Sequence, residues 1–345
     1  MTMRVATVLS AREWEARLVS AARSSASVRL VLRAFLPSEV SDHADDLDAV
    51  VVGSETPWAT PARLASWRRL GLLVVGIHPT GDRPAAARLH AAQADLVIAD
   101  DLPVDAMLRE IRLLEPAADR AGSTSRLFAV TGARGAPGRT EIAVALAWVL
   151  SRSEVTVLID ADLEAPGIAV RLSVAPRPDL ADAVDGVHAD GVVADGCLHD
   201  IGRLRILPGA HRPGEPALRP EPVFDVVDAA RSVGRVVVDT GPWPSGIEIV
   251  KSATDAIFVI DGSPLGIVRA TVVSAEWTGP PPTVIVNRVE PEHRDDVRLA
   301  VRRWTGLDPI VLIPPTRQVV GAARSGTAPS RRLLAALAPL AAEPA

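Results

Sequence analysis

The chain has 345 residues, 48% of them hydrophobic, and its formal net charge is −5 at neutral pH. This length suffices for two domains with separate cores, and the hydrophobic fraction excludes a mainly disordered chain. The acidic balance excludes an overall attraction to nucleic acid or to an anionic membrane.

The numbers of cysteine and lysine residues exclude some kinds of protein and indicate the type of organism. The single cysteine, Cys197, excludes an internal disulfide and the paired thiolates of an iron–sulfur site, and we interpret it as a small buried side chain. Lys251 is the only lysine, arginine is abundant and tyrosine is absent, which indicates a high-GC bacterium such as an actinobacterium. Without a secretory segment or a long apolar span, the sequence predicts a cytoplasmic protein.

Residues 1–116 alternate short apolar runs with amphipathic stretches, five times in succession. The apolar runs are typical of strands buried on both faces, and the intervening stretches are typical of helices. We therefore expect a parallel five-stranded sheet covered by helices. The expected strands cover residues 4–9, 28–32, 48–53, 72–77 and 95–99, and the expected helices cover 12–23, 37–45, 62–70, 84–93 and 103–114.

This order of elements resembles the receiver domain of response regulators, but the residues of receiver chemistry are replaced. Gly53 ends the third expected strand, where a receiver has its phosphoacceptor aspartate. Arg12 lies just after the first strand, where a receiver has an acidic pair. Asp100 and Asp101 end the fifth strand in place of a lysine, and we interpret them as caps. The resemblance implies docking or dimerisation rather than phosphorylation.

A second domain is expected after a polar linker. Residues 117–126 are rich in small residues, so we expect two domains, 1–116 and 127–345, joined by this stretch. A strand over 127–130, a Gly-rich turn and a helix over 140–150 follow, with Ile142, Leu146 and Val149 on one helix face. Such a strand, loop and helix N-terminus cradle phosphate, because N–H groups and the helix dipole favour an anion.

The loop sequence Arg-Gly-Ala-Pro-Gly-Arg-Thr-Glu, residues 134–141, resembles the deviant Walker A loop of the MinD/ParA family of P-loop ATPases. The usual form of that loop is Lys-Gly-Gly-x-Gly-Lys-Thr/Ser-Thr. The resemblance implies that Arg134 replaces the signature lysine, that Arg139 replaces the phosphate-gripping lysine, and that Thr140 is the Mg²⁺-binding hydroxyl. The other loop positions that would contact the nucleotide are Gly135, Ala136, Pro137, Gly138 and Glu141.

Two interpretations of Glu141 stay open. In the first, its carboxylate lies where the α-phosphate would be and pairs with Arg139, so nucleotide binding is weak or lost. In the second, Glu141 points to solvent and favours the helix dipole. Arginine at position 139 also differs from lysine, because a planar fork does not fit the cavity of a compact ammonium group.

Two later apolar strands end in aspartate, within residues 155–160 and 235–242. By the same resemblance, Asp162 positions the attacking water, Asp160 lies near the Mg²⁺ shell, and Asp239 coordinates Mg²⁺ through water. Carboxylate oxygens around phosphate-bound Mg²⁺ make chemical sense of these acids. The alternative is that Asp160 and Asp162 cap the turn that follows their strand.

The remaining chain has further strands and a base-binding candidate. Asn287 matches the family's adenine-contacting asparagine, with a turn residue at a strand end as the alternative. Pro314 falls in the loop around the base, although no acid stands near Thr316 as the family often has. Trp243 is interpreted as a packed loop residue rather than a partner anchor. Further strands are expected over 204–207, 256–260, 284–286 and 310–313, with helices over 179–185 and 222–231.

Two surface segments have competing interpretations. Arg298, Arg302 and Arg303 share a helical stretch that resembles a DNA-contacting surface, but nearby Asp295 and Asp296 favour a mixed solvated face. The apolar tail over 331–340 resembles the membrane helix of MinD. A proline at position 339 interrupts it and its charge is low, so docking onto the protein's own sheet is favoured.

A receiver-like domain fused to a MinD-like domain is similar to CpaE/TadZ pilus-assembly localisation proteins, and most similar to the actinobacterial CpaE-like septum site-determining (Ssd) proteins. The resemblance implies an α/β protein, with a receiver-like (βα)5 domain and a MinD/ParA-like P-loop domain whose sheet is mostly parallel. It implies a cytoplasmic spatial regulator of septum placement, or of Flp-type pilus or secretion assembly. Protein partners, a homodimer, and recruitment to the inner membrane face, cell pole or septum are implied as well.

ATP and Mg²⁺ are the cofactors that the resemblance implies. Because the loop is altered, we expect a degenerate site and a weak or inactive ATPase. The alternative is a working Mg²⁺-dependent ATPase switch, supported by Thr140, Asp160, Asp162 and Asp239. A ParA-like DNA-partitioning protein is a third, weaker hypothesis, and neither nucleic acid nor more than peripheral membrane contact is expected.

Overall fold

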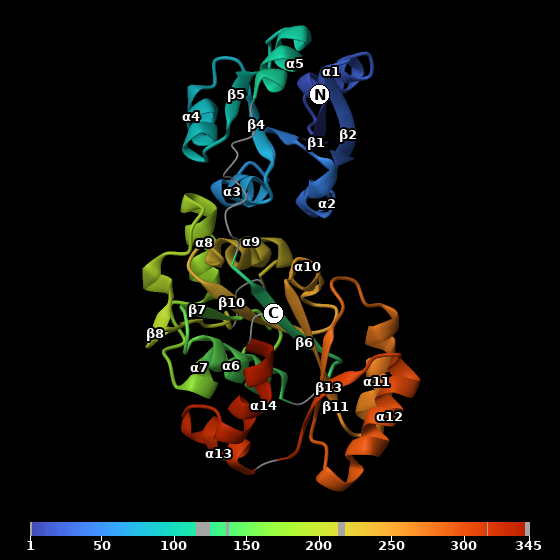
Figure 1. Ribbon diagram of the computed structural model, residues 1–345. Coiled ribbons are helices and arrows are strands. Elements are labelled where there is room, and N and C mark those ends of the chain that lie inside the picture. Colours follow the sequence, from blue (N-terminus) through green and yellow to red (C-terminus); the bar gives the residue numbers. More distant parts are fainter. Residues whose placement is uncertain (1, 115–124, 136–137, 213–217, 316, 342–345) are drawn as a thin grey trace. The chain divides into compact units, whose positions relative to one another are not determined.

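The computed structural model describes residues 2–114, 125–135, 138–212, 218–315 and 317–341 (Figure 1). The chain divides into two compact units. The first comprises Met1–Thr124 with Gly186–Val192, and the second comprises Ser125–Asp185 with Val193–Ala345. Among the residues that the structure describes, none of the helices has the length and apolar character required to span a bilayer.

The first unit is a five-stranded parallel sheet in the order β2-β1-β3-β4-β5. This is the strand order of receiver and flavodoxin-like folds, so the predicted receiver-like fold is confirmed. One expected helix, over 37–45, divides into α2 and a 3-10 turn at Ala44–Asp46. The strands are β1 (Met3–Val8), β2 (Val28–Ala34), β3 (Ala49–Gly53), β4 (Leu73–His78) and β5 (Leu96–Ala99). The helices are α1 (Glu13–Ala22), α2 (Pro37–Asp42), α3 (Pro61–Arg69), α4 (Arg83–Ala91) and α5 (Val104–Leu113).

Apolar side chains cover both faces of this sheet, because successive residues of a strand point to opposite sides. Val51 of β3 packs in a cluster with Trp14 and Met107. Its neighbour Val50 packs in a second cluster with Trp67. All five residues of β3 are buried, as the continuous apolar run predicts for a central parallel strand.

The second unit contains an eight-stranded sheet in the order β13-β12-β11-β6-β10-β7-β9-β8. All neighbouring strands are parallel except β8, which pairs antiparallel with β9. The expected mostly parallel sheet is therefore confirmed. The strands are β6 (Leu127–Gly132), β7 (Thr156–Asp160), β8 (His199–Ile201), β9 (Leu204–Leu207), β10 (Arg235–Pro242), β11 (Asp255–Asp261), β12 (Thr283–Asn287) and β13 (Pro309–Ile313).

The helices of the second unit include short ones that sequence analysis missed. Two of them, α7 and α10, have five residues each, which is too short to show a helical period. The helices are α6 (Arg139–Leu150), α7 (Ile168–Leu172), α8 (Leu180–Asp190), α9 (Pro220–Ala230), α10 (Ile247–Lys251), α11 (Pro264–Ala275), α12 (Arg294–Thr305), α13 (Arg317–Ser325) and α14 (Arg331–Ala341). Helix α8 begins in the second unit, and its residues from Gly186 onward belong to the first.

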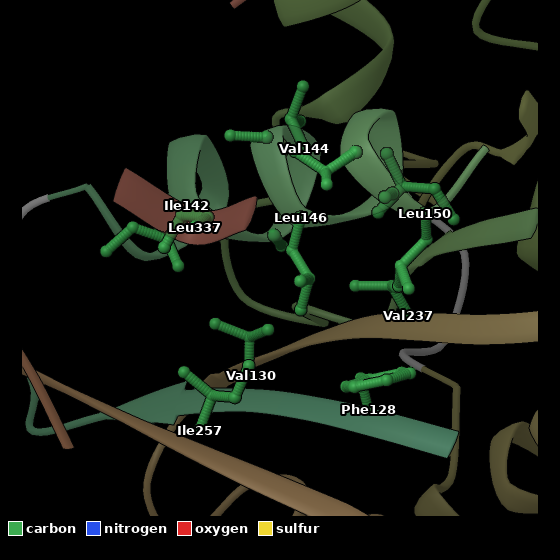
Figure 2. Close-up of a cluster of buried hydrophobic side chains, with 14 of the residues drawn as sticks. Phe128, Val130, Ile142, Val144, Leu146, Leu150, Val237, Ile257 and Leu337 are labelled. Carbon is green, nitrogen blue, oxygen red and sulfur yellow. The ribbon is translucent and has the colours of Figure 1, made fainter. Parts of the chain in front are cut away.

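Helix α6 is buried nearly all round, rather than on the one face that was expected. Figure 2 shows Leu146 and Leu150 directed toward the sheet residues Val130 and Val237. Leucines 333, 334 and 337 of α14 join the same core, so α14 covers part of α6 that would otherwise face water.

The apolar tail therefore packs on the protein itself, as predicted, against α6 and β13. The predicted interruption at Pro339 is wrong, since α14 continues through it to Ala341. The proline has no N–H to donate to the carbonyl oxygen four residues earlier, so the helix lacks one hydrogen bond at this turn.

Candidate functional site

The loop between β6 and α6 bends through two glycines. Gly135 has φ +79° and Gly138 has φ +88°, a left-handed conformation that favours glycine. A side chain at position 138 would also overlap the amide nitrogen of Asn287. The two loop glycines of the matched pattern are therefore required by the backbone. Ala136 and Pro137, predicted to contact the nucleotide, lie outside the described residues.

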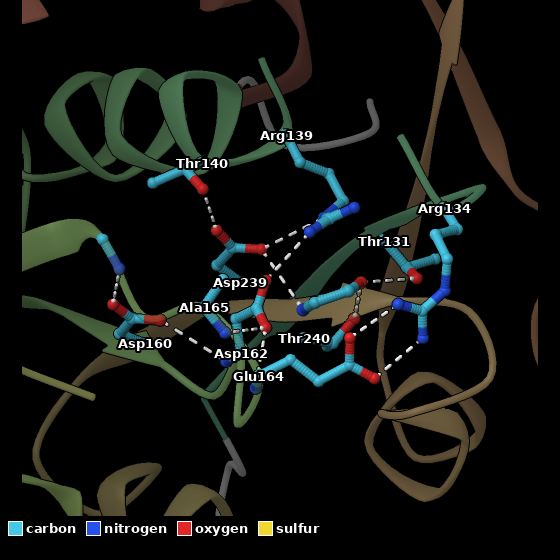
Figure 3. A network of polar contacts seen from close by, with 12 residues as sticks. Thr131, Arg134, Arg139, Thr140, Asp160, Asp162, Glu164, Ala165, Asp239 and Thr240 are labelled. Atoms are coloured by element: carbon cyan, nitrogen blue, oxygen red, sulfur yellow. Dashed lines mark hydrogen bonds and ion pairs between the residues drawn. The ribbon is translucent and has the colours of Figure 1, made fainter. Parts of the chain in front are cut away.

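The hydroxyl of Thr140 and the carboxylate of Asp239 lie next to each other at this loop (Figure 3). Strand β10 pairs with both β6 and β7, so its carboxyl end lies beside the loop. The Oγ1 of Thr140 donates a hydrogen bond of 2.5 Å to Oδ2 of Asp239. Asp239 is 1% exposed, and burial raises its pKa, although the Thr140 hydrogen bond and nearby Arg139 oppose the rise.

Arg139 reaches across to the same strand ends. Its Nη2 donates to Oδ2 of Asp162 at 3.0 Å, and its Nε lies 3.5 Å from Oδ1 of Asp239. The Nε–H is buried and, within the described chain, forms no hydrogen bond of normal geometry. The guanidinium therefore partly neutralises two buried acids, and it keeps one donor unsatisfied. The predicted pairing of Arg139 with Glu141 is wrong.

Asp160 caps the segment that follows β7. Its Oδ2 accepts hydrogen bonds from the backbone N–H of Gly167 at 2.8 Å and of Ile168 at 2.9 Å. Burial raises the pKa of Asp160 to about 7, more than these hydrogen bonds lower it, and the nearby Asp239 adds to the rise. The capping alternative for Asp160 is thus what the contacts support.

Asp162 caps the same turn while it binds Arg139. Its Oδ1 accepts hydrogen bonds from the backbone N–H of Glu164 at 3.1 Å and of Ala165 at 3.0 Å. With Oδ2 bonded to Arg139, both carboxylate oxygens have partners. If Asp162 also positioned the attacking water, as the resemblance implies, its carboxylate would have to bind that water in addition to Arg139 and the two backbone N–H groups.

Glu141 has a partner that the sequence did not reveal. It is 9% exposed and accepts hydrogen bonds from Arg171 of α7, from Nε at 2.5 Å and from Nη2 at 2.9 Å. Arg171 is 7% exposed, and its Nη1 donates to the carbonyl oxygen of Thr327 at 2.8 Å. Both earlier interpretations of Glu141, pairing with Arg139 and pointing to solvent, are wrong. The reason is the short helix α7, which inserts an arginine behind α6.

Arg134, at the position of the signature lysine, is paired within its own chain. Its two Nη atoms donate to the two carboxylate oxygens of Glu164, both at 2.8 Å. Hydrogen bonding with Arg134 lowers the pKa of Glu164. Both side chains are largely exposed, so this pair is screened by solvent and exchanges readily.

The base-binding candidates are only partly brought together. Asn287 lies at the end of β12, next to Gly138 of the loop, and its Oδ1 accepts from the backbone N–H of Arg288 at 3.0 Å. It is thus a turn residue that also touches the loop. Pro314 lines a cavity of about 200 Å³ together with Arg294 of α12 and with residues of β13 and α14. Thr316 lies outside the described residues.

The oxygen ligands at the loop fit a magnesium ion. In the described part of the chain, no group of three or more His, Cys, Asp or Glu side chains is arranged to hold a metal. Mg²⁺ needs few protein ligands, because it keeps several waters and is bound with substrate phosphates. The adjacent hydroxyl of Thr140 and carboxylate of Asp239 provide the hard oxygen donors that this ion prefers.

Comparison with known proteins gives one sequence relative of note. No protein-family model matches the chain. The antiactivator FleN of Pseudomonas aeruginosa is 30% identical over 156 residues, which are 42% of this chain and 54% of FleN. The chain therefore spans about half the length of that curated relative.

Solved structures share the architecture. A ParA family ATPase from Chlorobium tepidum matches with a TM-score of 0.54 at 21% identity, over 63% of this chain and 98% of that one. This chain carries the ParA and MinD ATPase fold. A chain of the MinC:MinD cell division protein complex from Aquifex aeolicus gives a TM-score of 0.52 at 19% identity, over 64% and 97%.

In the ParA/MinD-like unit, two of the arginines for which DNA contact was the less favoured alternative are engaged with an acid. Arg302 donates to both carboxylate oxygens of Asp308, at 2.7 and 2.6 Å, and Arg298 lies 3.7 Å from the same group. The interpretation as a mixed solvated face agrees with these contacts. Asp308, rather than Asp295 or Asp296, is the acid that pairs with them.

Two single residues of the ParA/MinD-like unit have different outcomes. Trp243 is 7% exposed and stacks on Trp277 with ring centroids 5.2 Å apart, so its predicted packing role is confirmed. Cys197 was expected to be buried, but it is only half-buried because it lies in a short 3-10 turn. Burial of this degree raises the pKa of its thiol.

The receiver-like unit has its phosphoacceptor position filled by a neighbour. A side chain at Gly53 would overlap the carboxylate of Glu55, which accepts hydrogen bonds from Ser10 and from the indole of Trp14. A carboxylate is therefore present at that position, but it is supplied two residues later and is already bonded.

Of the two acids that follow β5, only Asp100 has the predicted capping contact. Asp100 accepts from the backbone N–H of Thr80 at 2.9 Å, which caps a turn as predicted. It also pairs with Arg12, whose Nε lies at 3.0 Å and Nη2 at 2.5 Å. The N-cap residue of α5 is Pro103, so the predicted capping role of Asp101 at this helix is wrong.

Proposed function

We propose that this chain is a regulatory P-loop protein of the MinD/ParA type with a weakened ATP switch, which acts through protein partners. The observation that carries the proposal is the pairing of the charged groups at the loop. Arg139 is bound to Asp162 and lies near Asp239. A nucleotide would have to compete for a cation that is already neutralised.

Electrostatics supports a weak and magnesium-dependent site. ATP alone would bring several negative charges close to the buried carboxylates of Asp162 and Asp239. Drawing Arg139 toward phosphate would also leave those carboxylates without their cation, which is costly at a buried position. A divalent cation offsets both effects, so binding is expected to require Mg²⁺.

Part of the machinery would still fit Mg²⁺-ATP, which when bound would supply phosphoryl-transfer chemistry. Thr140 and Asp239 would hold the cation, and the glycine loop with the α6 N-terminus would hold phosphate. Asn287, beside Gly138, would lie toward the base. Asp160 serves as a cap and, by resemblance, as a neighbour of the metal shell, while Asp162 would orient water.

The biological role is inferred from the relatives and from the two-unit organisation. FleN is described as an antiactivator, and MinD as a cell division protein that forms a complex with MinC. Together with a receiver-like unit whose phosphoacceptor position is filled, these relatives support a spatial regulator of the CpaE-like, septum site-determining kind. Its partners would belong to the division machinery or to Flp-type pilus or secretion assembly, at the inner membrane face, pole or septum.

A homodimer is part of this proposal. The pair of Arg134 and Glu164 is exposed, with side chains 72% and 50% accessible. An exposed pair costs little to exchange, so Arg134 would be free to contact the nucleotide of a second copy, as an arginine finger does.

Titration calorimetry with ATP and ADP, with and without Mg²⁺, tests the proposed switch. We expect Mg²⁺-ATP to bind more weakly than about 100 µM, near −5.5 kcal/mol, and ATP without Mg²⁺ to give no measurable heat. Binding at about 1 µM together with steady hydrolysis would instead establish the alternative, a working ATPase switch.

Removing the Glu141–Arg171 pair is expected to change nucleotide affinity little. The double substitution Glu141→Thr with Arg171→Met restores the family's hydroxyl and leaves no buried arginine alone. Because Arg171 already neutralises Glu141, we expect Mg²⁺-ATP affinity to stay within about threefold of the wild type in the same titration. A rise of about tenfold or more would mean that the pair obstructs the site. The single Glu141→Thr variant is the less informative control, since it leaves Arg171 buried and unpaired.

A further inference from the structure

Arg269 of α11 lies against the loop, although no sequence motif singled it out. Strand β11 runs parallel beside β6, so α11, which follows it, begins next to the loop after β6. The Nη1 of Arg269 donates to the carbonyl oxygen of Arg134 at 3.4 Å. The same atom lies 2.7 Å from where a side chain on Gly135 would begin. The absence of a side chain at Gly135 therefore lets the guanidinium rest on the loop backbone.

The charge of Arg269 is not neutralised as those of its neighbours are. Arg134 is paired with Glu164, and Arg139 with Asp162. Across the residues that the structure describes, no carboxylate pairs with Arg269, and its side chain is exposed. Its one hydrogen bond is long and goes to a neutral carbonyl, so an anionic acceptor would replace it with a shorter and stronger bond.

The backbone that carries Arg269 is held firmly. The flanking residues Ile267 and Ala270 are buried against the sheet side of α11. The helix start is capped by Ser263, whose Oγ accepts from the backbone N–H of Gly266 at 3.1 Å and donates to Asp261 at 2.6 Å. Only the arginine side chain therefore has to move in order to follow a ligand.

We propose that Arg269 is the guanidinium that contacts phosphate bound at this loop, in the role that Arg139 fills poorly because it is held by acids. The inference rests on the proposed function, in that it assumes an anion site at the loop. Its ligand class is a polyphosphate, either of a nucleotide or as free pyrophosphate, which a planar guanidinium binds through two parallel hydrogen bonds.

The test compares three variants of the full chain in calorimetric titrations with Mg²⁺-ATP and with Mg²⁺-pyrophosphate. We expect Arg269→Ala to weaken both ligands about tenfold, and Arg269→Lys to recover part of the loss because it keeps the charge but not the fork. The matched control is Arg303→Ala on α12, an equally exposed arginine that stacks on Trp304, and it should leave both affinities within about twofold. The melting temperature without ligand should not change in any Arg269 variant.

Three results would overturn the inference. Arg269→Ala could bind both ligands as the wild type does, or Arg303→Ala could weaken them equally, which would indicate a general charge effect. The wild type could also bind neither ligand at millimolar concentration, which would show that the loop is not an anion site. That last result leaves the partner-mediated role standing.

By contrast, tight Mg²⁺-ATP binding that depends on Arg269 would support the inference and refute the weakened switch. Loss of pyrophosphate binding separates a phosphate contact from a contact to the base.

Discussion

Replacing Arg171 by alanine is expected to lower the free energy of unfolding of the ParA/MinD-like unit by about 3–5 kcal/mol. The substitution leaves the Glu141 carboxylate buried without a cation, and it removes the hydrogen bond to the Thr327 carbonyl. Removing one partner of a buried ion pair lowers the free energy of unfolding far more than replacing both partners by apolar side chains, because the remaining charge stays buried without a counter-charge. Urea unfolding followed by circular dichroism measures the change, and amide exchange in α6 assigns it to this unit.

Two controls separate the buried pair from a general loss of arginine. Arg134→Ala removes an exposed bidentate pair with Glu164 and is expected to change the free energy of unfolding far less than Arg171→Ala does, because solvent screens the pair. The double variant Glu141→Leu with Arg171→Met replaces both charges by apolar side chains and is expected to recover most of the stability. If Arg171→Ala and Arg134→Ala were equally stable, the buried pair would contribute nothing beyond a surface contact.

The wild-type protein is expected to lose stability at neutral and alkaline pH, because Asp160 ionises there while it is buried. Replacing Asp160 by asparagine should abolish this loss. The pKa of Asp160 is raised by burial from its ordinary value of 3.8 to about 7. Between these values the folded protein binds more protons than the unfolded chain, so wild-type stability falls as pH rises through this window. At about 1.4 kcal/mol per unit, the loss amounts to at most about 4 kcal/mol. The asparagine carbonyl can still accept the hydrogen bonds from Gly167 and Ile168.

Urea unfolding at about pH 5 and about pH 8 checks this expectation. The asparagine variant should be more stable than the wild type at the higher pH, and the advantage should shrink toward the lower one. Asp308→Asn is a control whose effect should be the same at both pH values. Hydrogen bonding with Arg302 lowers the pKa of this exposed acid below 3.8, so its stabilising effect is fully present at both values and is lost only at more acidic pH. Parallel pH profiles for the wild type and Asp160→Asn would contradict a raised pKa.

Local pattern was sufficient to predict most elements and one part of the site. Continuous apolar runs predicted parallel strands, because only a sheet covered on both faces buries them. The resemblance to the MinD/ParA family assigned Thr140 and Asp239 to one Mg²⁺ site although 99 positions separate them, and the parallel strands do bring them together at one edge of the sheet. The glycines at 135 and 138 matched the family's loop pattern, and the structure explains the match because only glycine adopts their backbone conformation without strain.

The sequence by itself determined two α/β units, a receiver-like sheet without its phosphoacceptor, and a phosphate-loop pattern with a glutamate at position 141. Only the tertiary structure decided which charges pair. Arg171 lies in a five-residue helix that has no periodic signal, and it reaches Glu141 from 30 positions away. Arg139 likewise meets Asp162 and Asp239 only where separate strands end. Periodicity reports which residues are buried, whereas the partner of a buried charge depends on how elements distant in the chain pack together.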